Sequence, residues 1–182
     1  MMDDQGLYMS RRKITISTSG VVPKIRQMAD ELGVNLAISF HACNDELRNE
    51  IVPINRKYPI KVLLESCRNF MEGKANREKI TIEYVMLHDV NDSDDNAREL
   101  AVLLKDVPCK VNLIPFNPFP ETRYTRSSNN RIHRFRDILE AAGLIVMTRK
   151  TRGEDIDAAC GQLAGKVNDK SRRDIHFARI ES

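Results

Sequence analysis

The fold is predicted from Ile80-Thr-Ile-Glu-Tyr-Val-Met-Leu87, which has a mixed apolar and polar pattern, together with Cys109-Lys-Val-Asn-Leu-Ile-Pro-Phe116. Short runs of this composition predict β-strands. Residues 95–104, which lie between them, follow a helical pattern of apolar positions. A strand, a helix and a second strand in this order are typical of a parallel βαβ unit. The chain is therefore expected to belong to the α/β class.

The same alternation extends to both sides of this unit. Further strands are predicted at 13–17, 34–38 and 144–149, and further helices at 22–32, 61–71, 129–142 and 155–167. Gly33 and Gly143 stand where C-caps of two of these helices are expected. Five strands separated by helices predict one parallel sheet.

Unusual residues follow the predicted strands. They are Ser17, Ser39-Phe40-His41, His88-Asp89, Asn117 and the segment 151–160. In barrel-type α/β enzymes, the carboxyl ends of the strands form the active-site face. The connections 42–59 and 117–130 are also longer than the usual ~2–6 residues. Together these features predict a site or a lid at this edge.

Cys160 lies in the run Thr151-Arg-Gly-Glu-Asp-Ile-Asp-Ala-Ala-Cys160, among small residues that would let another group approach the sulfur. The acids before it suit a helix N-terminus. A cysteine one turn inside such a helix could have a lowered thiol pKa and act as a nucleophile. The alternative is a buried structural cysteine.

Composition is that of an ordinary globular domain, with 182 residues, 41% hydrophobic residues, 30% charged residues and a formal charge of +3. Basic residues cluster in the last third, at Arg123, Arg126, Arg131, Arg134, Arg136, Arg149, Lys150 and Arg152. This cluster could neutralise RNA phosphates or could be a solvated face. Without a long apolar run or a signal-peptide pattern, we expect a cytoplasmic protein with no membrane span.

No metal site is predicted. Cys43, Cys67, Cys109 and Cys160 lack the close spacing of iron–sulfur or zinc ligands, and unpatterned cysteines suit a reducing cytoplasm. The acidic run 89–95 lacks the glycine and the final glutamate of a calcium loop, so it is interpreted as a solvated turn with a helix cap. A serine hydrolase is disfavoured because no Gly-x-Ser-x-Gly elbow is present.

Several long motifs, in order along the chain, resemble the RlmN family of radical-SAM enzymes, which methylate C2 of adenine in RNA. They are Ser10-Arg-Arg-Lys-Ile-Thr-Ile-Ser-Thr-Ser-Gly20, 36–46, 49–55, 81–87, 112–120 and the Cys160 segment. The resemblance runs from about Ser10 to Gly165. The family's C8-methylating relatives share part of these motifs, but residues 149–155 are more similar to the C2 group.

The resemblance implies the later portion of a partial (β/α)6 TIM-like radical-SAM barrel over residues 1–167, followed by a charged tail at 168–182. The family's Cys-x3-Cys-x2-Cys cluster motif, its Gly-Gly-Glu motif, its second catalytic cysteine and its N-terminal domain are not found. We therefore expect the C-terminal half of a longer enzyme, with Met1 as an internal residue. Alone, the half barrel would expose a strand edge near Lys13, so low solubility and no turnover are expected.

The resemblance also implies roles for individual residues. Cys160 matches the cysteine that carries the methyl group as S-methylcysteine. The positions that match S-adenosylmethionine (SAM) ligands are Ser17, Ser39, Phe40, His41 and Asn117. The complete enzyme would use SAM and a [4Fe–4S] cluster, whose ligands are not in this chain. It would act on 23S rRNA and tRNA with an electron donor, as a monomer, and a disulfide bond is among the expected features.

Two other functions stay open from the residues alone. One is a non-catalytic RNA-binding or assembly module that retains half of the barrel. The other is a cysteine-dependent enzyme without radical chemistry, although no base is paired with Cys160 in the sequence.

Overall fold

The computed structural model describes residues 14–31, 34–74 and 78–149. Its five strands are β1 (Thr15–Thr18), β2 (Asn35–Ser39), β3 (Ile80–Met86), β4 (Cys109–Pro115) and β5 (Ile145–Thr148). They form one parallel sheet in the order β1-β2-β3-β4-β5. The predicted α/β class and all five strands are confirmed, with boundaries within about two residues.

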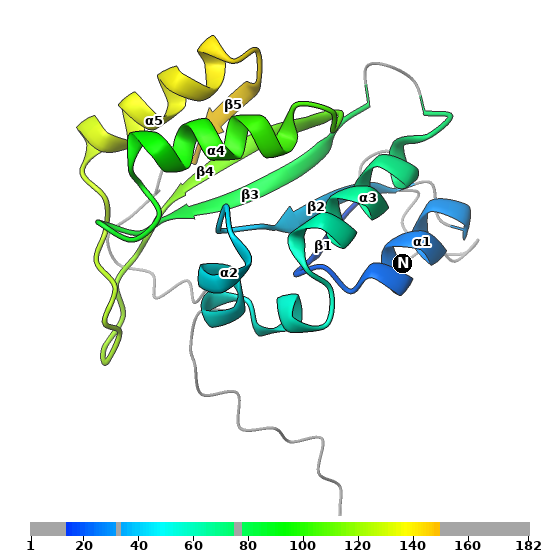
Figure 1. Ribbon diagram of the computed structural model, residues 1–182, viewed down its shortest axis with the longest axis horizontal. Helices are drawn as coiled ribbons and strands as arrows, with labels where there is room; N and C mark the ends of the chain where they lie inside the picture. Colours follow the sequence, from blue (N-terminus) through cyan, green and yellow to red (C-terminus); the bar gives the residue numbers. More distant parts are fainter. Residues whose placement is uncertain (1–13, 32–33, 75–77, 150–182) are drawn as a thin grey trace, which may run out of the picture.

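Four long helices connect the strands and lie on one face of the sheet (Figure 1). They are α1 (Val22–Glu31), α3 (Ile60–Met71), α4 (Asp94–Leu104) and α5 (Asn129–Ala141). Gly143, with φ of 88°, follows α5 as the sequence predicts. The helix predicted at 155–167 and the tail at 168–182 lie outside the described residues, as does Gly33.

The connection 42–59 differs from the expectation of a loop. It contains a short helix, α2 (Asp45–Ile51), and a 3-10 turn, η2 (Pro53–Arg56). The Asn44 side chain accepts from the Leu47 N–H and caps α2. A helix this short shows too few turns for its apolar period to be read from sequence. The other long connection, from Asn117 to α5, stays irregular.

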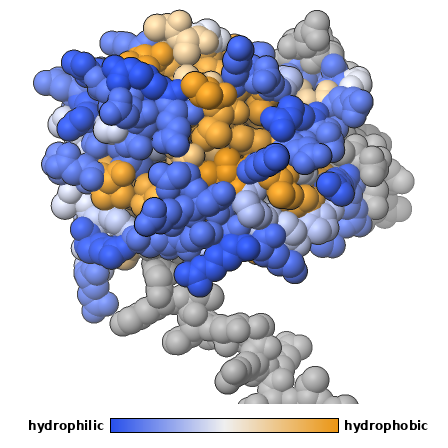
Figure 2. All heavy atoms as spheres, in the orientation of Figure 1, coloured by the Kyte–Doolittle hydropathy of each residue, from blue (hydrophilic) through white to orange (hydrophobic). Residues whose placement is uncertain are grey.

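The two faces of the sheet differ in chemistry. Toward the helices, the strands present a continuous apolar core that includes Ile38, Phe40, Ile82, Tyr84 and Val111, each fully buried. Apolar surface also gathers on the outside of this helix layer (Figure 2). Toward the opposite face, the alternate positions are mainly polar: Thr15, Ser17, Ser39, Thr81, Glu83, Lys110 and Asn112, of which all but Ser39 are less buried. Because successive side chains of a strand point to opposite faces, this alternation places the polar side chains on the face of the sheet away from the helices.

No helix among the described residues is long and apolar enough to cross a membrane. The cysteines in the same part of the chain, Cys43, Cys67 and Cys109, are buried free thiols. The expected disulfide bond is therefore not seen there, and Cys160 lies outside the described residues.

Candidate functional site

Ser17 and Ser39 meet at one carboxylate. The Ser17 hydroxyl donates to Oε2 of Glu83 at 3.0 Å, and the Ser39 hydroxyl donates to the same oxygen at 3.4 Å. The three residues come from the neighbouring strands β1, β2 and β3, on the polar face. Two of the five predicted SAM residues are thus brought together, around an acid that sequence reasoning did not single out.

His41 lies just beyond the carboxyl end of β2, in the left-handed region with φ of 62°. Its Nδ1 accepts from the backbone N–H of Val85 at 3.2 Å, which assigns the proton of the neutral ring to Nε2. Burial, with the charge of Arg48 adding to it, lowers the pKa of His41 to about 4. The ring is therefore a neutral donor at neutral pH.

Arg48 joins the ends of β1 and β2 by hydrogen bonds to their backbone carbonyl oxygens. This side chain is fully buried. Its donors reach the carbonyl oxygens of Phe40 at 3.0 Å, Ser39 at 3.1 Å and Ser19 at 2.9 Å, and Oδ1 of Asn55 at 2.8 Å. Burial lowers the pKa of Arg48 to about 10, so it remains charged. No sequence signal marked it, because a single arginine in a short polar helix resembles a solvated residue.

Phe40 contributes differently from the other predicted SAM residues. Its side chain is fully buried in the helix-facing core. Its N–H donates to the Glu83 carbonyl, and its own carbonyl accepts from Ala42 and Arg48. Phe40 thus fixes the strand end on which its two neighbours, Ser39 and His41, are presented.

Asn117 comes two residues after the end of β4, at the same edge of the sheet as Ser39 and His41, and it is exposed. Its side chain makes no hydrogen bond within the part of the chain that the structure describes. The last predicted site residue, Cys160, falls outside that part.

A buried asparagine, Asn91, joins the loop after β3 to His41. Its Nδ2 donates to the carbonyl oxygens of His41 at 2.9 Å and Val85 at 2.7 Å, and its Oδ1 accepts from the Leu87 N–H at 2.8 Å. Ser93 then caps α4 through a capping box with Asn96. The turn and the helix cap expected in this acidic run are confirmed, but the turn is not solvated throughout as expected, because Asn91 and Asp92 are buried.

Three side chains of this turn, His88, Asp89 and Asp92, each offer one ligand atom within 4.8 Å of the others. The imidazole already lies 3.3 Å from Asp89 and 3.8 Å from Asp92. Arg131 supplies a positive charge, with Nη2 lying 3.5 Å from Oδ1 of Asp89. The carboxylate of Asp89 is thus paired with an arginine of the protein itself.

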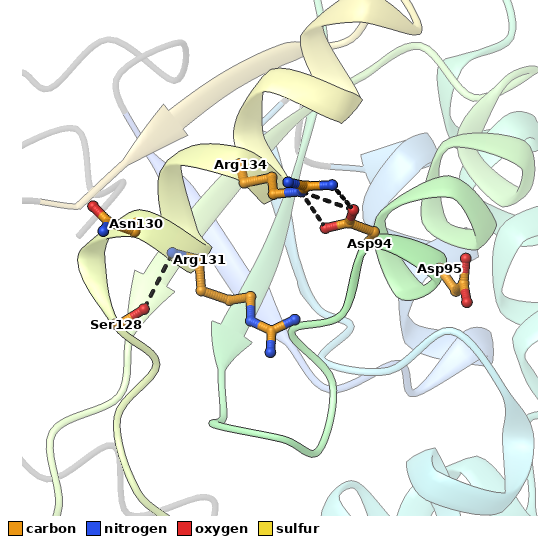
Figure 3. Close-up of a pocket in the computed structure, with 6 residues that line it drawn as sticks. All are labelled: Asp94, Asp95, Ser128, Asn130, Arg131 and Arg134. Atoms are coloured by element: carbon orange, nitrogen blue, oxygen red, sulfur yellow. Dashed lines mark hydrogen bonds and ion pairs between the residues drawn. The ribbon is translucent and has the colours of Figure 1, made fainter.

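Several arginines of the basic cluster pair with acids. Figure 3 shows Arg134 of α5 directed at Asp94 at the start of α4, where Nε lies 2.8 Å from both carboxylate oxygens. The hydrogen bond from Arg134 lowers the pKa of Asp94. Arg136 pairs with Asp137, and Arg123 with Glu50. Part of the positive charge that suggested RNA binding is therefore compensated within the fold.

The described cysteines do not fit an iron–sulfur cluster. Burial raises the pKa of Cys43 and Cys67 to about 12 and that of Cys109 to about 11. Cluster ligands are thiolates, whereas these thiols are neutral members of the apolar core. The polar strand ends offer groups of the kind that bind SAM, namely the hydroxyls of Ser17 and Ser39, the carboxylate of Glu83 and, beyond the end of β2, the ring of His41.

Comparisons with known proteins find that the chain is similar to radical-SAM enzymes. It superposes on a radical SAM methyltransferase from Sphaerobacter thermophilus with a TM-score of 0.82 and 50% identity, covering 89% of this chain and 47% of that one. A domain of a pyruvate-formate lyase-activating enzyme from Bacteroides vulgatus shares the fold alone, at 15% identity and a TM-score of 0.57, over 75% of this chain and 80% of that one. The fold is thus the TIM-like α/β fold of radical-SAM methyltransferases.

The chain is similar to RlmN proteins along nearly its whole length. It is 56% identical over 99% of its residues to the dual-specificity RNA methyltransferases RlmN of Pseudomonas putida and Pseudomonas entomophila. It spans about half the length of these curated relatives, 47% and 48%. No model of a protein family matches the chain.

Proposed function

We propose that this chain supplies the C-terminal, SAM-binding and methyl-carrying half of an enzyme that methylates C2 of adenine in 23S rRNA and certain tRNAs. The observation that carries the proposal is the similarity to RlmN along 99% of the chain, combined with two of the matched SAM positions, Ser17 and Ser39, meeting on the polar face. Residues 1–167 form the barrel portion in this proposal, and 168–182 form a tail.

SAM would supply the methyl group, and the residues of this chain would hold and orient it. The hydroxyls of Ser17 and Ser39 bind its polar groups, and Nε2 of His41 donates a hydrogen bond to it. The exposed side chain of Asn117 reaches the adenine edge, because an amide both donates and accepts. Phe40 holds the end of β2 in position because its side chain is buried in the core.

Cys160 is the proposed methyl carrier. Its small neighbours, Ala158, Ala159 and Gly161, suit close approach of SAM and then of the adenine ring. The buried cysteines of the sheet and helices do not suit this role, since neutral core thiols are poor nucleophiles.

The remaining requirements would be met outside this chain. The [4Fe–4S] cluster would be bound by cysteines in the other half of the enzyme and reduced by an electron donor. The complete enzyme would be monomeric and cytoplasmic. Its RNA would approach the carboxyl ends of the strands, where the candidate SAM site opens.

The test is RNA methylation from labelled SAM by the complete enzyme with Cys160→Ala. Methylation is expected to be abolished while the iron content stays unchanged. Cys67→Ala, which removes a core thiol instead, is the matched control and is expected to methylate RNA. Persistent methylation by Cys160→Ala would remove Cys160 from this role, and RNA binding without methylation by the unaltered enzyme would favour a non-catalytic binding module.

A further inference from the structure

The loop 117–128 leads from the end of β4 to segments that follow two other strands. On its return toward α5 it contacts the segment after β3, where the His88 N–H donates to the Thr125 carbonyl at 3.0 Å. An antiparallel bridge between Leu87 and Arg126 continues this contact. The loop is therefore attached beyond the carboxyl end of β3 as well as to β4.

Tyr124 joins this loop to the segment that follows β2. Its ring packs against two small apolar clusters. One cluster lies after β2 and includes Ile51 and Val52. The other lies at the ends of β3 and β4 and includes Leu87 and Phe116, whose ring meets that of Tyr124 edge-on with the centroids 6.4 Å apart. Of the residues that the structure describes, Tyr124 alone packs against both clusters.

The Tyr124 hydroxyl extends this contact to a charged group. It donates to Oε1 of Glu50 at 2.7 Å, and the Arg123 guanidinium pairs with the same oxygen. Glu50 belongs to α2, the helix that follows His41 in the chain. Because the loop begins with Asn117, the Tyr124–Glu50 contact connects the two segments that carry His41 and Asn117, which are both candidate SAM residues.

We propose that the Tyr124–Glu50 hydrogen bond positions Asn117 for binding SAM, an inference that rests on the proposed function. The Asn117 side chain is exposed, so its place relative to His41 depends on how the loop is held and not on side chains packed around it. A loop that is held before the ligand arrives loses less conformational entropy on binding, which raises affinity. Tyr124 and Glu50 are thus positioning residues, which act on SAM through Asn117.

A purely structural role would have a different signature. Glu50 and Arg123 have side chains that are 49% and 68% exposed, and exposed pairs contribute little to the free energy of unfolding. The packing is made by the ring of Tyr124, which remains when the hydroxyl is removed. Loss of the hydroxyl alone should therefore change the placement of the loop and leave the stability of the fold nearly unchanged.

The test is calorimetric binding of S-adenosylhomocysteine to the complete enzyme with Tyr124→Phe, with Asn117→Ala and with both changes. Each single variant is expected to bind about threefold to tenfold more weakly than the wild type, as the net strength of one hydrogen bond predicts. In the double variant the loss should equal that of Asn117→Ala alone, because the residue through which Tyr124 acts has been removed. The unfolding midpoint in denaturant should stay unchanged in Tyr124→Phe.

Tyr58→Phe is the matched control. The Tyr58 ring packs against the main core, and loss of its hydroxyl should leave the affinity unchanged. Glu50→Ala should lose the same factor of affinity as Tyr124→Phe. Glu50→Gln keeps a side-chain oxygen that can accept from the Tyr124 hydroxyl, so it should bind more tightly than Glu50→Ala.

Additive losses in the double variant would mean that Tyr124 does not act through Asn117, and they would overturn the inference. Wild-type affinity in either single variant, or an unfolding midpoint that falls together with the affinity in Tyr124→Phe, would overturn it too. A complete wild-type enzyme that binds no S-adenosylhomocysteine would overturn the proposed function as well.

Discussion

Nη2 of Arg48 lies 3.1 Å from the carbonyl oxygen of Ser39, so a fully buried cation holds the backbone of a residue whose hydroxyl belongs to the candidate SAM site. Among the residues that the structure describes, no carboxylate accepts a hydrogen bond from this guanidinium; its acceptors are three carbonyl oxygens and the amide of Asn55. The charged guanidinium therefore joins the ends of β1 and β2 by donating hydrogen bonds to neutral oxygens of both segments.

The first prediction concerns this anchor. Arg48→Met should lower the free energy of unfolding by at least ~3 kcal/mol, because buried acceptors would lose their donor and each unsatisfied group costs roughly 1–3 kcal/mol. SAM affinity should fall in parallel. Denaturant unfolding of the complete enzyme measures the first effect. Arg98→Ala, which removes an arginine from exposed ion pairs, should cost less than about 1 kcal/mol. Equal losses for both variants would contradict the anchor role.

The second prediction concerns Asn91. Asn91→Asp keeps the shape but replaces Nδ2, which donates to His41 and Val85, by an acceptor. A loss of roughly 2–4 kcal/mol is expected in unfolding, since buried carbonyls would then face a buried carboxylate. Asn130→Asp is the control. It adds an acid at the exposed N-terminal turn of α5, where negative charge is favourable, and should be neutral or slightly stabilising.

The third prediction is a dependence of stability on pH. The pKa of His41 falls from 6.5 to about 4 on folding, so the unfolded state binds the extra proton between these values. This contribution to stability is complete above pH 6.5 and is lost as the pH falls toward 4. At pH 4 the loss approaches about 3 kcal/mol. His41→Asn suits the left-handed backbone and does not titrate. If the fall in unfolding free energy between pH 7 and 5 is as steep in this variant as in wild type, His41 is not its source.

The fourth prediction concerns thiol reactivity. Cys43, Cys67 and Cys109 should resist alkylation by iodoacetamide at pH 8 in the native enzyme, because the pKa of each is raised to about 11 or 12 by burial. All three should react after denaturation, as peptide mass spectrometry would show. Rapid native labelling of any of them would mean that the core opens locally on the timescale of the reaction.

Local patterns predicted most of the fold. Alternating apolar runs marked each strand, and the three- and four-residue spacing in 129–142 marked α5, because secondary structure repeats at short range along the chain. The short helix α2 was missed since seven residues carry little periodicity. The polar positions at the strand ends were also visible in sequence, and Ser17, Ser39 and His41 do gather at one edge of the sheet.

The sequence by itself determined the α/β class, the five strands and the resemblance to RlmN proteins, since these depend on local periodicity and on long matched motifs. Only the tertiary structure decided which polar groups act together. Glu83 meets Ser17 from 66 positions away, and Val85 sets the tautomer of His41 from 44 positions away. Such partnerships depend on how the strands align side by side, and no spacing along the chain records that alignment.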